Sequence, residues 1–195
     1  TTAKMLTLLE NRGGLIHVPM LYLGDVPNPP SHKCFGYKDP IKRGWTFNHR
    51  SLTDPYFICS SGTGYCMASH QEWSAVDGVN APFREGIGGG ETLLDMKFWM
   101  FGKKVWMHPE CLFWHYAKKR SYVWTMGQFY WNQLVAYYCL GGREFMEKMN
   151  AELSYPQGKD VLDKVEVLSK AHRRFIEENA KFTLEQVLQN QPWLN

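Results

Sequence analysis

A carboxylate directly follows a run of three glycines in the middle of the chain. Glu91 comes after Gly88–Gly90 and opens the segment Thr92–Phe101, which is apolar almost all round and predicts a buried helix. The positive end of a helix dipole favours a carboxylate, and glycines leave room for a ligand beside it. Glu91 is therefore the first candidate for a binding or catalytic group, the alternative being a residue that only satisfies the helix start.

A histidine and a basic cluster follow that helix. His115 ends a predicted strand, where a lone histidine is usually structural or solvated. Lys118, Lys119 and Arg120 come next, close to Tyr122. Such a cluster is able to bind phosphate groups, although a solvated basic surface is its more common role.

The elements that must position these residues alternate between helix and strand as far as residue 122. This order is typical of an α/β sheet protein. Helices are predicted over Thr2–Asn11 and Thr92–Phe101, and strands over Leu15–Leu23, Phe57–Cys59, Tyr65–Ala68, Lys104–Met107 and Leu112–His115.

From residue 123 the pattern becomes helical. Gly141 and Gly142 are expected to end a first helix, and Thr183 with Gln186 makes a capping box for a last short one. The helices are predicted over Gln128–Leu140, over a segment with the apolar stripe Phe145, Met146, Met149 and Leu153, and over Asp160–Phe182 with Val161, Val165, Leu168 and Phe175 on one side.

Two loops offer further candidate binding residues. The segment Gly24–Asp54 is rich in proline and glycine and predicts a long surface loop that contains Trp45. Ser60–Gly64 is a short turn whose glycines, Gly64 among them, let the backbone approach a ligand or a neighbouring segment closely.

Composition is that of an ordinary globular protein. The 195 residues are 44% apolar and carry a net charge of +3, so bulk charge does not demand a nucleic-acid partner. Five cysteines without a CxxC pair argue against a disulfide framework and favour a reducing, cytoplasmic location. No apolar stretch is long enough for a membrane span.

Taken together, the glycine turn, the helix and the following strand resemble a known family signature. The run comprises Gly88–Thr92, Asp95, Trp99, Gly102, Pro109 and His115. It resembles the acceptor side of GT-A glycosyltransferases, especially the polypeptide N-acetylgalactosaminyltransferases and related family 2-like enzymes. In those enzymes a Trp-Gly-Gly-Glu-Asn turn precedes a helix, and a His follows a Pro by six residues.

This resemblance implies a metal-dependent glycosyltransferase that moves a sugar from a nucleotide-sugar donor to an acceptor hydroxyl. The family places its nucleotide-binding half and its metal motif first, so we expect this chain to begin after them. Residues 1–122 would form the acceptor-side half of a Rossmann-like GT-A domain, and residues 123–195 a helical extension. An upstream half, in the same polypeptide or a separate chain, would bind the donor, and the isolated chain would be inactive.

The resemblance also implies roles for single residues. His115 would be a ligand of Mn²⁺ or Mg²⁺, and Lys118–Arg120, with Tyr122, would close over the donor diphosphate. Glu91 would bind the acceptor or act as the catalytic carboxylate. The remaining expected substrate-binding residues are Trp45, Gly64, Gly88, Gly89, Gly90 and Thr92.

One position departs from the family pattern. Inverting relatives commonly carry Asp as general base directly after the Glu, whereas this chain has Thr92. Asp95 or Glu91 would then have to substitute, which tilts the prediction towards a retaining mechanism. The alternative is a non-catalytic module that recognises a glycan, a protein or nucleic acid. The acceptor itself, protein, glycan or modified nucleobase, stays open.

Overall fold

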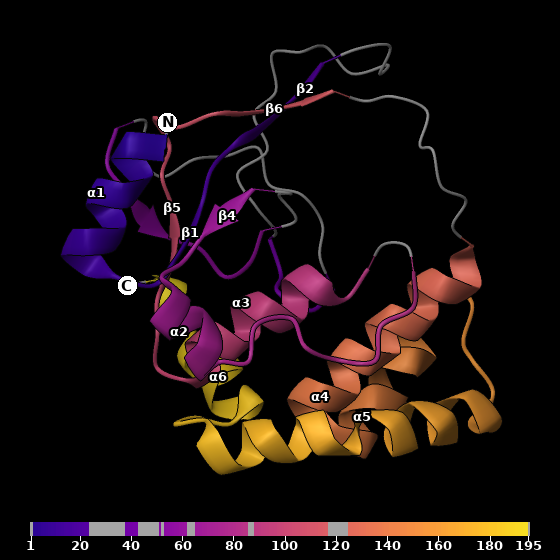
Figure 1. The fold of residues 1–195 in the computed structure, drawn as a ribbon. Helices are drawn as coiled ribbons and strands as arrows, with labels where there is room; N and C mark the ends of the chain where they lie inside the picture. The colour runs from indigo at the N-terminus through magenta and orange to yellow at the C-terminus, as the bar shows by residue number, and fades with distance from the viewer. Residues whose placement is uncertain are drawn as a thin grey trace.

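The computed structural model describes residues 2–23, 38–42, 51, 53–61, 65–85, 88–116 and 125–194, with the backbone alone for 20–23 and 114–116. These residues form an α/β fold in which one helix covers one face of a small mixed sheet and the other helices gather at the opposite face (Figure 1). The elements are α1 (Thr2–Arg12), β1 (Leu15–His17), β2 (Met20–Leu23), β3 (Tyr56–Phe57), β4 (Cys66–Met67), α2 (His70–Ala75), α3 (Gly90–Met100), β5 (Val105–Met107), β6 (Phe113–Tyr116), α4 (Met126–Glu152), α5 (Lys159–Asn179) and α6 (Leu184–Asn190), followed by a 3₁₀ turn (Pro192–Leu194).

The central strands of the sheet are β1 and β5. They pair in parallel, with Ile16 opposite Trp106, and the strand order is β3-β5-β1-β4. The outer strands β3 and β4 run antiparallel to them. The prediction of an α/β sheet followed by a helical C-terminal section is therefore confirmed, and the first helix of that section begins at Met126, two residues before the predicted Gln128.

The predicted single strand Leu15–Leu23 is divided into β1 and β2. Pro19 lies at the break, and because proline has no N–H it cannot donate to a ladder. Its carbonyl still accepts a hydrogen bond from Phe113 N–H at 3.0 Å. Beyond the break, β2 pairs in parallel with β6 in a separate two-stranded ladder.

Alternation along β1 assigns its side chains to the two faces of the sheet. Ile16 packs with Met5 and Leu8 of α1, so this face forms a small core under that helix. Leu15 points to the other face and joins the main core with residues of α3 and α4. His17 lies two residues further, on the same face as Leu15, and is buried.

Helix α3 is buried on all sides and ends at a glycine. Gly102 has φ 71° and follows the last helical turn. Its N–H bonds to the Trp99 carbonyl at 3.0 Å, and the Lys103 N–H bonds to the Phe98 carbonyl at 2.8 Å. This pair of bonds is a Schellman motif, as a glycine after the helix predicts.

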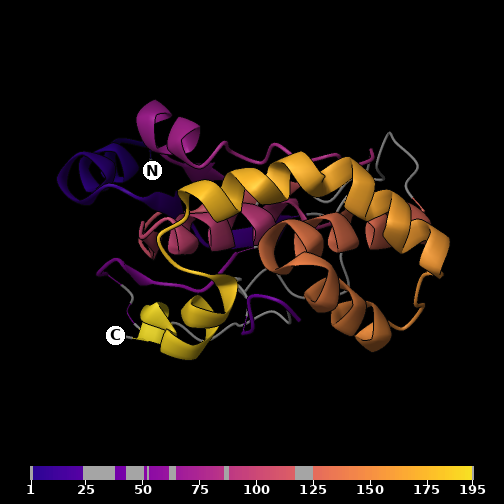
Figure 2. The same cartoon turned by 90° about the horizontal axis from the view of Figure 1, so that it is seen from below.

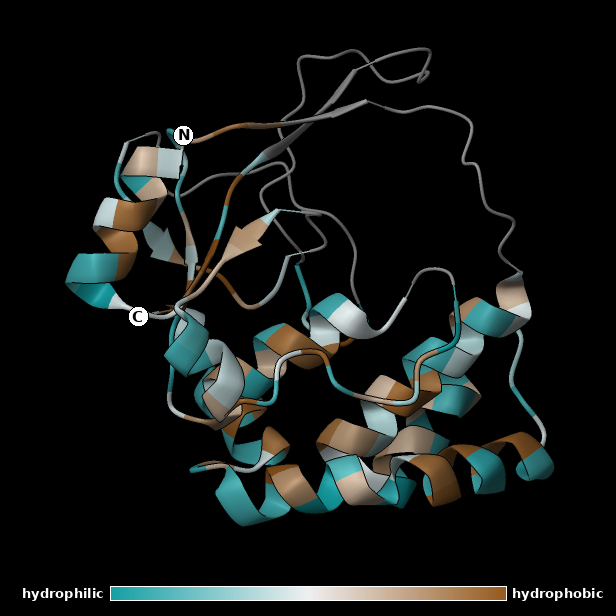
Figure 3. Ribbon diagram, in the orientation of Figure 1, coloured by the Kyte–Doolittle hydropathy of each residue, from teal (hydrophilic) through white to brown (hydrophobic). Residues whose placement is uncertain are grey.

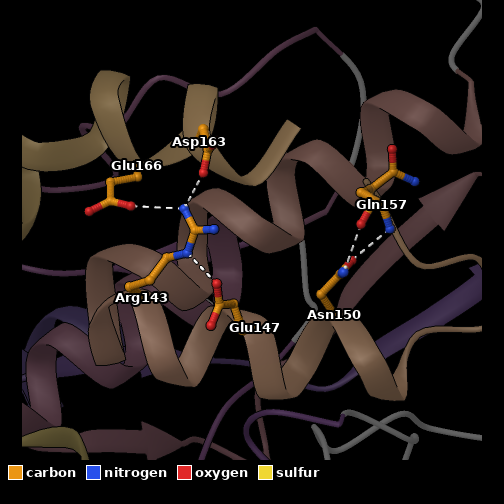
Figure 4. A network of polar contacts seen from close by, with 6 residues as sticks. All are labelled: Arg143, Glu147, Asn150, Gln157, Asp163 and Glu166. Atoms are coloured by element: carbon orange, nitrogen blue, oxygen red, sulfur yellow. Dashed lines mark hydrogen bonds and ion pairs between the residues drawn. The ribbon is translucent and has the colours of Figure 1, made fainter. Parts of the chain in front are cut away.

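Helix α4 continues past the expected stop but breaks there. Gly142, with φ 77° and ψ −168°, is non-helical inside the range Met126–Glu152. Arg173 of α5 donates to the freed carbonyls of Cys139 and Leu140. Just beyond the break, Arg143 binds Glu147, Asp163 and Glu166, while Asn150 exchanges two hydrogen bonds with the backbone of Gln157 (Figure 4).

Helix α5 packs along α4 and shows alternating polar and apolar bands (Figures 2 and 3). It begins at Lys159 and ends at Asn179, three residues before the predicted end. The prediction that Leu168 belongs to its buried side is wrong, because this side chain is 55% exposed. Leu162, Val165 and Ile176 form the buried stripe instead.

None of the helices in the described part of the chain is long and apolar enough to cross a membrane. Four cysteines lie in that part, Cys59, Cys66, Cys111 and Cys139, and the structure shows them as thiols rather than disulfides.

Candidate functional site

The glycine turn before α3 is shaped by close packing against α4. Gly88 and Gly89 have φ values of 105° and 76°, which favour glycine. A Cβ on Gly89 would lie 2.2 Å from the carbonyl oxygen of Asn132, and one on Gly88 would lie 2.8 Å from the ring of Phe129. These two glycines therefore allow α4 to approach. Around Gly90, by contrast, a Cβ would meet nothing within 4 Å.

Helix α4 also holds the segment that leads into this turn. The Asn132 side chain accepts from the Arg84 N–H at 2.8 Å and donates to the Arg84 carbonyl at 3.1 Å. Trp131 donates to the Pro82 carbonyl at 3.1 Å, and the Arg84 guanidinium lies 3.7 Å from the centre of its ring. The segment that leads into the glycine turn is thus bound to α4 at Pro82 and Arg84.

Asp95 is fully buried in α3, and protein groups bind both of its carboxylate oxygens. Oδ1 lies 2.8 Å from Nε2 of His17, at the end of β1. Oδ2 accepts hydrogen bonds of 2.7 Å from Ser60 Oγ and from the Ser61 N–H. A buried carboxylate is costly unless it is paired and hydrogen-bonded, and these contacts supply that compensation. Asp95 therefore joins α3 to β1 and to the segment after β3.

A second contact from α3 reaches the same segment. Trp99 lies one helical turn after Asp95, and its indole N–H is 3.2 Å from the carbonyls of both Ile58 and Cys59. The residues that follow β3 are consequently bound to α3 by a side chain from each of two successive turns.

Glu91 lies one turn before Asp95 and is half-buried at the start of α3. The charges of both carboxylates act on the thiol of Cys66 on β4. Burial raises the pKa of Cys66 to about 12, and the charges of Asp95 and Glu91 add to the rise. His17 is the cross-strand partner of Cys66. Glu91, Asp95, Cys66 and His17 thus gather between the start of α3 and the end of β1.

The raised pKa makes Cys66 a weak nucleophile at neutral pH, because the thiolate is the reactive form. Cys59 behaves in the same way, since burial raises its pKa to about 12 with a smaller contribution from Asp95. The chemistry available in this cluster is therefore acid–base and hydrogen-bonding chemistry centred on carboxylates, with Glu91 at its solvent-facing end.

The other predicted site residues fall into two groups. Thr92 is fully buried, next to Glu91. Trp99 and Trp106 are also buried. Trp45, Gly64, Lys118, Lys119, Arg120 and Tyr122 lie outside the described residues.

His115 is placed by its backbone alone. It lies on β6 opposite Tyr22 of β2, in the ladder that extends away from α3 (Figure 1). Among the residues whose side chains are described, no three His, Cys, Asp or Glu groups come together in a way that could hold a metal ion. The metal assignment therefore stays a prediction.

Two open hollows lie on the helical side of the described structure, away from this cluster. One of about 290 Å³ lies between residues 38–42 and the second half of α4, and one of about 630 Å³ lies between α4, Arg173 and α6. They share Phe145, Lys148 and Leu188. Neither is lined by Glu91, Asp95 or His17.

Three members of the site were not found from the sequence: His17, Ser60 and Asn132. A signal was present for two of them. His17 interrupts the apolar strand Leu15–Val18, and Asn132 interrupts the apolar stretch of α4. A polar residue inside a buried apolar run needs a partner, and that need marks it for attention. For Ser60 we find no such signal.

The chain matches no known protein-family model. None of the curated proteins is similar to it in sequence.

Proposed function

We propose that the chain forms the acceptor side of a GT-A type, nucleotide-sugar-dependent glycosyltransferase, in which Glu91 binds and polarises the acceptor hydroxyl. One observation carries this proposal: a half-buried carboxylate at the first turn of α3, directly after the glycine turn and above a buried, fully bonded aspartate. The motif Gly88–His115, which resembles the acceptor-side signature of that family, supports it.

Between the two candidate carboxylates, the contacts favour Glu91. Both oxygens of Asp95 are occupied and its side chain is fully buried, so a substrate hydroxyl has no direct access to it. Glu91 is partly open to solvent and sits where the helix dipole stabilises negative charge. A carboxylate in this place can accept the proton of a hydroxyl as bond formation proceeds.

The donor side of the reaction is part of the same proposal. Lys118, Lys119 and Arg120, with Tyr122, would cover the diphosphate, and a divalent cation would neutralise its charge when bound, with His115 as one ligand. The nucleotide would bind to a second, Rossmann-like half, in the same polypeptide or a partner chain. Residues 1–122 would then be the acceptor half and 123–195 a helical extension.

The test compares Glu91→Gln with Glu85→Gln, an exposed glutamate just before the glycine turn. The full-length gene product, with any nucleotide-binding partner that co-purifies, is incubated with Mn²⁺ and UDP-N-acetylglucosamine, UDP-N-acetylgalactosamine, UDP-glucose or GDP-mannose. Released nucleoside diphosphate is measured. We expect Glu91→Gln to lower turnover by roughly a hundredfold while nucleotide affinity hardly changes, because the charge acts on the acceptor.

Glu85→Gln should keep wild-type turnover. If Glu91→Gln releases nucleoside diphosphate as fast as the wild type, Glu91 has no role in the reaction. If no nucleotide sugar is turned over by the wild type, and glycans or peptides nevertheless bind in a manner that Glu91→Gln abolishes, the non-catalytic binding module is the correct function.

A further inference from the structure

We propose that His17, Ser60 and Asp95 are positioning residues that hold the Glu91 face of α3 in one orientation against the carboxyl end of β1. The inference rests on the proposed function for the chemical meaning of Glu91. The orientation itself is a property of the fold that can be measured without sugar transfer.

The first support is the spacing along α3. Glu91, Asp95 and Trp99 follow each other at intervals of four residues, so their side chains lie on one face of the helix. Asp95 and Trp99 both bind the segment after β3, and Asp95 also binds His17. Rotating this face away would strip the contacts from two successive turns.

The second support is the nature of the other contacts around α3. Leu93, Leu94, Met96 and Phe98 are buried on its remaining sides. Apolar packing of this kind is non-directional, so it favours burial of the helix more than any single rotation about its axis. Hydrogen bonds of 2.7–2.8 Å to both oxygens of one carboxylate are directional.

The third support is energetic. A small rotation of α3 would leave Asp95 buried without a donor, and removing one partner of a buried charge costs about 3–5 kcal/mol. The network therefore penalises alternative orientations strongly. Glu91 lies one turn away on the same helix, so the contacts that fix the orientation of Asp95 also fix the direction in which Glu91 points.

Cys66 provides a probe of this arrangement that is independent of activity. Its thiol pKa, about 12, is raised in part by the charges of Asp95 and Glu91, and its side chain is partly exposed. Removing the Glu91 charge should therefore increase the thiolate fraction and speed alkylation. The gain depends on how close Glu91 is held to Cys66, which is the quantity that the positioning network is inferred to control.

The experiment is a double-mutant cycle on the alkylation rate of Cys66. The wild-type chain, Glu91→Gln, Asp95→Asn and the double variant react with iodoacetamide at pH 8.5, and mass spectrometry of the Cys66 peptide follows each reaction. In the background that keeps Asp95, we expect Glu91→Gln to speed alkylation of Cys66 by about threefold, as loss of a nearby like charge predicts. In the Asp95→Asn background the effect should fall below about 1.5-fold, because Glu91 is no longer held near the thiol.

Two controls keep the result interpretable. Ser169→Ala removes a fully buried serine of α5 outside the network and should leave the threefold ratio unchanged. Alkylation of the buried Cys111 in the same digest reports any global opening of the fold. If Asp95→Asn does not fold, Ser60→Ala keeps the carboxylate, removes one donor and should also reduce the ratio.

An equal Glu91→Gln effect in both backgrounds overturns the positioning role, even if sugar transfer is found. A reduced ratio supports it, even if no nucleotide sugar proves to be a substrate. Where sugar transfer is measured, Asp95→Asn should lower kcat with little change in KM. In the Glu91→Gln background, the same Asp95→Asn substitution should lower kcat only slightly. A purely structural network would instead give additive losses.

Discussion

Two charged side chains are buried two positions apart on α3, and each has a different kind of partner. Asp95 faces the side chain of His17 and two serines. Lys97, 1% exposed, donates to the Asp77 carbonyl at 3.2 Å and the Gly78 carbonyl at 2.8 Å. Carbonyl dipoles offset only part of the cost of burying a full charge, and burial lowers the pKa of Lys97 to about 8.

This pKa gives the stability of the protein a defined pH dependence. Below pH 8 the lysine is charged in both the folded and the unfolded chain, so burial of the ammonium costs free energy. Between pH 8 and its ordinary value of 10.5 the unfolded chain binds the proton more tightly, and the free energy of unfolding therefore rises with pH.

Lys97→Met should remove that rise. The difference in unfolding free energy between wild type and variant should grow by about 1 kcal/mol in favour of the wild type from pH 7 to 9, measured by urea unfolding. The comparison of the two proteins cancels the opposite effect of the buried thiols, whose raised pKa values lower stability above about pH 9. Lys170→Met, at an exposed site on α5, should show no such trend. A pH-independent difference would contradict the assignment.

A second residue-scale prediction concerns the cation. If His115 is a metal ligand, as the motif implies, His115→Ala should weaken Mn²⁺ binding in calorimetric titration and lower turnover by roughly a hundredfold, since one ligand contributes a few kcal/mol. The fold should hardly change. His172→Ala on α5 serves as the control. Unchanged Mn²⁺ affinity in His115→Ala would leave His115 with a structural role.

At the scale of elements, the contact between α3 and α4 decides the shape of the glycine turn. The carbonyl of Asn132 and the ring of Phe129 occupy the space in which Cβ atoms of Gly89 and Gly88 would lie. The sequence motif alone favoured room for a ligand, whereas the structure shows that a neighbouring helix fills the space at two of the three glycines. Gly90 retains open space.

A matched pair of substitutions tests this difference. Gly89→Ala combines a left-handed φ of 76° with a contact of 2.2 Å to a backbone oxygen, so we expect a loss of about 2 kcal/mol or more in unfolding free energy. Gly90→Ala places a methyl group in open space on a helical residue, so the unfolding free energy should stay the same or rise by up to about 1 kcal/mol. Chemical unfolding measures both. Equal destabilisation by the two substitutions would refute the packing role of Gly89.

At the scale of the whole molecule, the helical C-terminal section and the sheet share one hydrophobic core. Its buried residues extend from Leu15 to Trp193. Trp193 lies 6.1 Å from Trp99 between ring centres, and the N–H groups of Lys181 and Phe182 both bond to the carbonyl of Met100 at 2.9 Å. The end of the chain is therefore packed against the helix that carries Glu91 and Asp95.

This shared core predicts that residues 1–195 unfold in one transition, with equal calorimetric and van't Hoff enthalpies. Trp193→Ala should lower the stability of the whole chain by about 3 kcal/mol, because a buried aromatic side chain is lost. Leu194→Ala, 58% exposed, should change it little. Two separate heat-absorption peaks, of which Trp193→Ala moves only one, would show that residues 123–195 fold as an independent unit.

Local signals in the sequence were sufficient for most of the helices. The capping boxes of α4 and α6, at Thr125 and Thr183, and the glycine after α3 are short-range interactions, so residue types within a few positions determine them. The short helix α2 was missed, although Ser69 caps it, because six residues show no helical period. The strand break at Pro19 was missed although the proline itself signals it, whereas the exposure of Leu168 depended on neighbours that periodicity does not reveal.

The site itself was decided by tertiary structure. The sequence alone determined that a carboxylate would stand at the start of a buried helix after a glycine turn. It did not determine that Asp95 would meet His17, 78 residues away, and Ser60, 35 residues away. Hydrogen-bond partners at such separations follow from strand order and helix packing, and these depend on the burial of the whole chain rather than on any local pattern. The same argument applies to Gly88 and Gly89, whose need for glycine comes from a helix some 40 positions later.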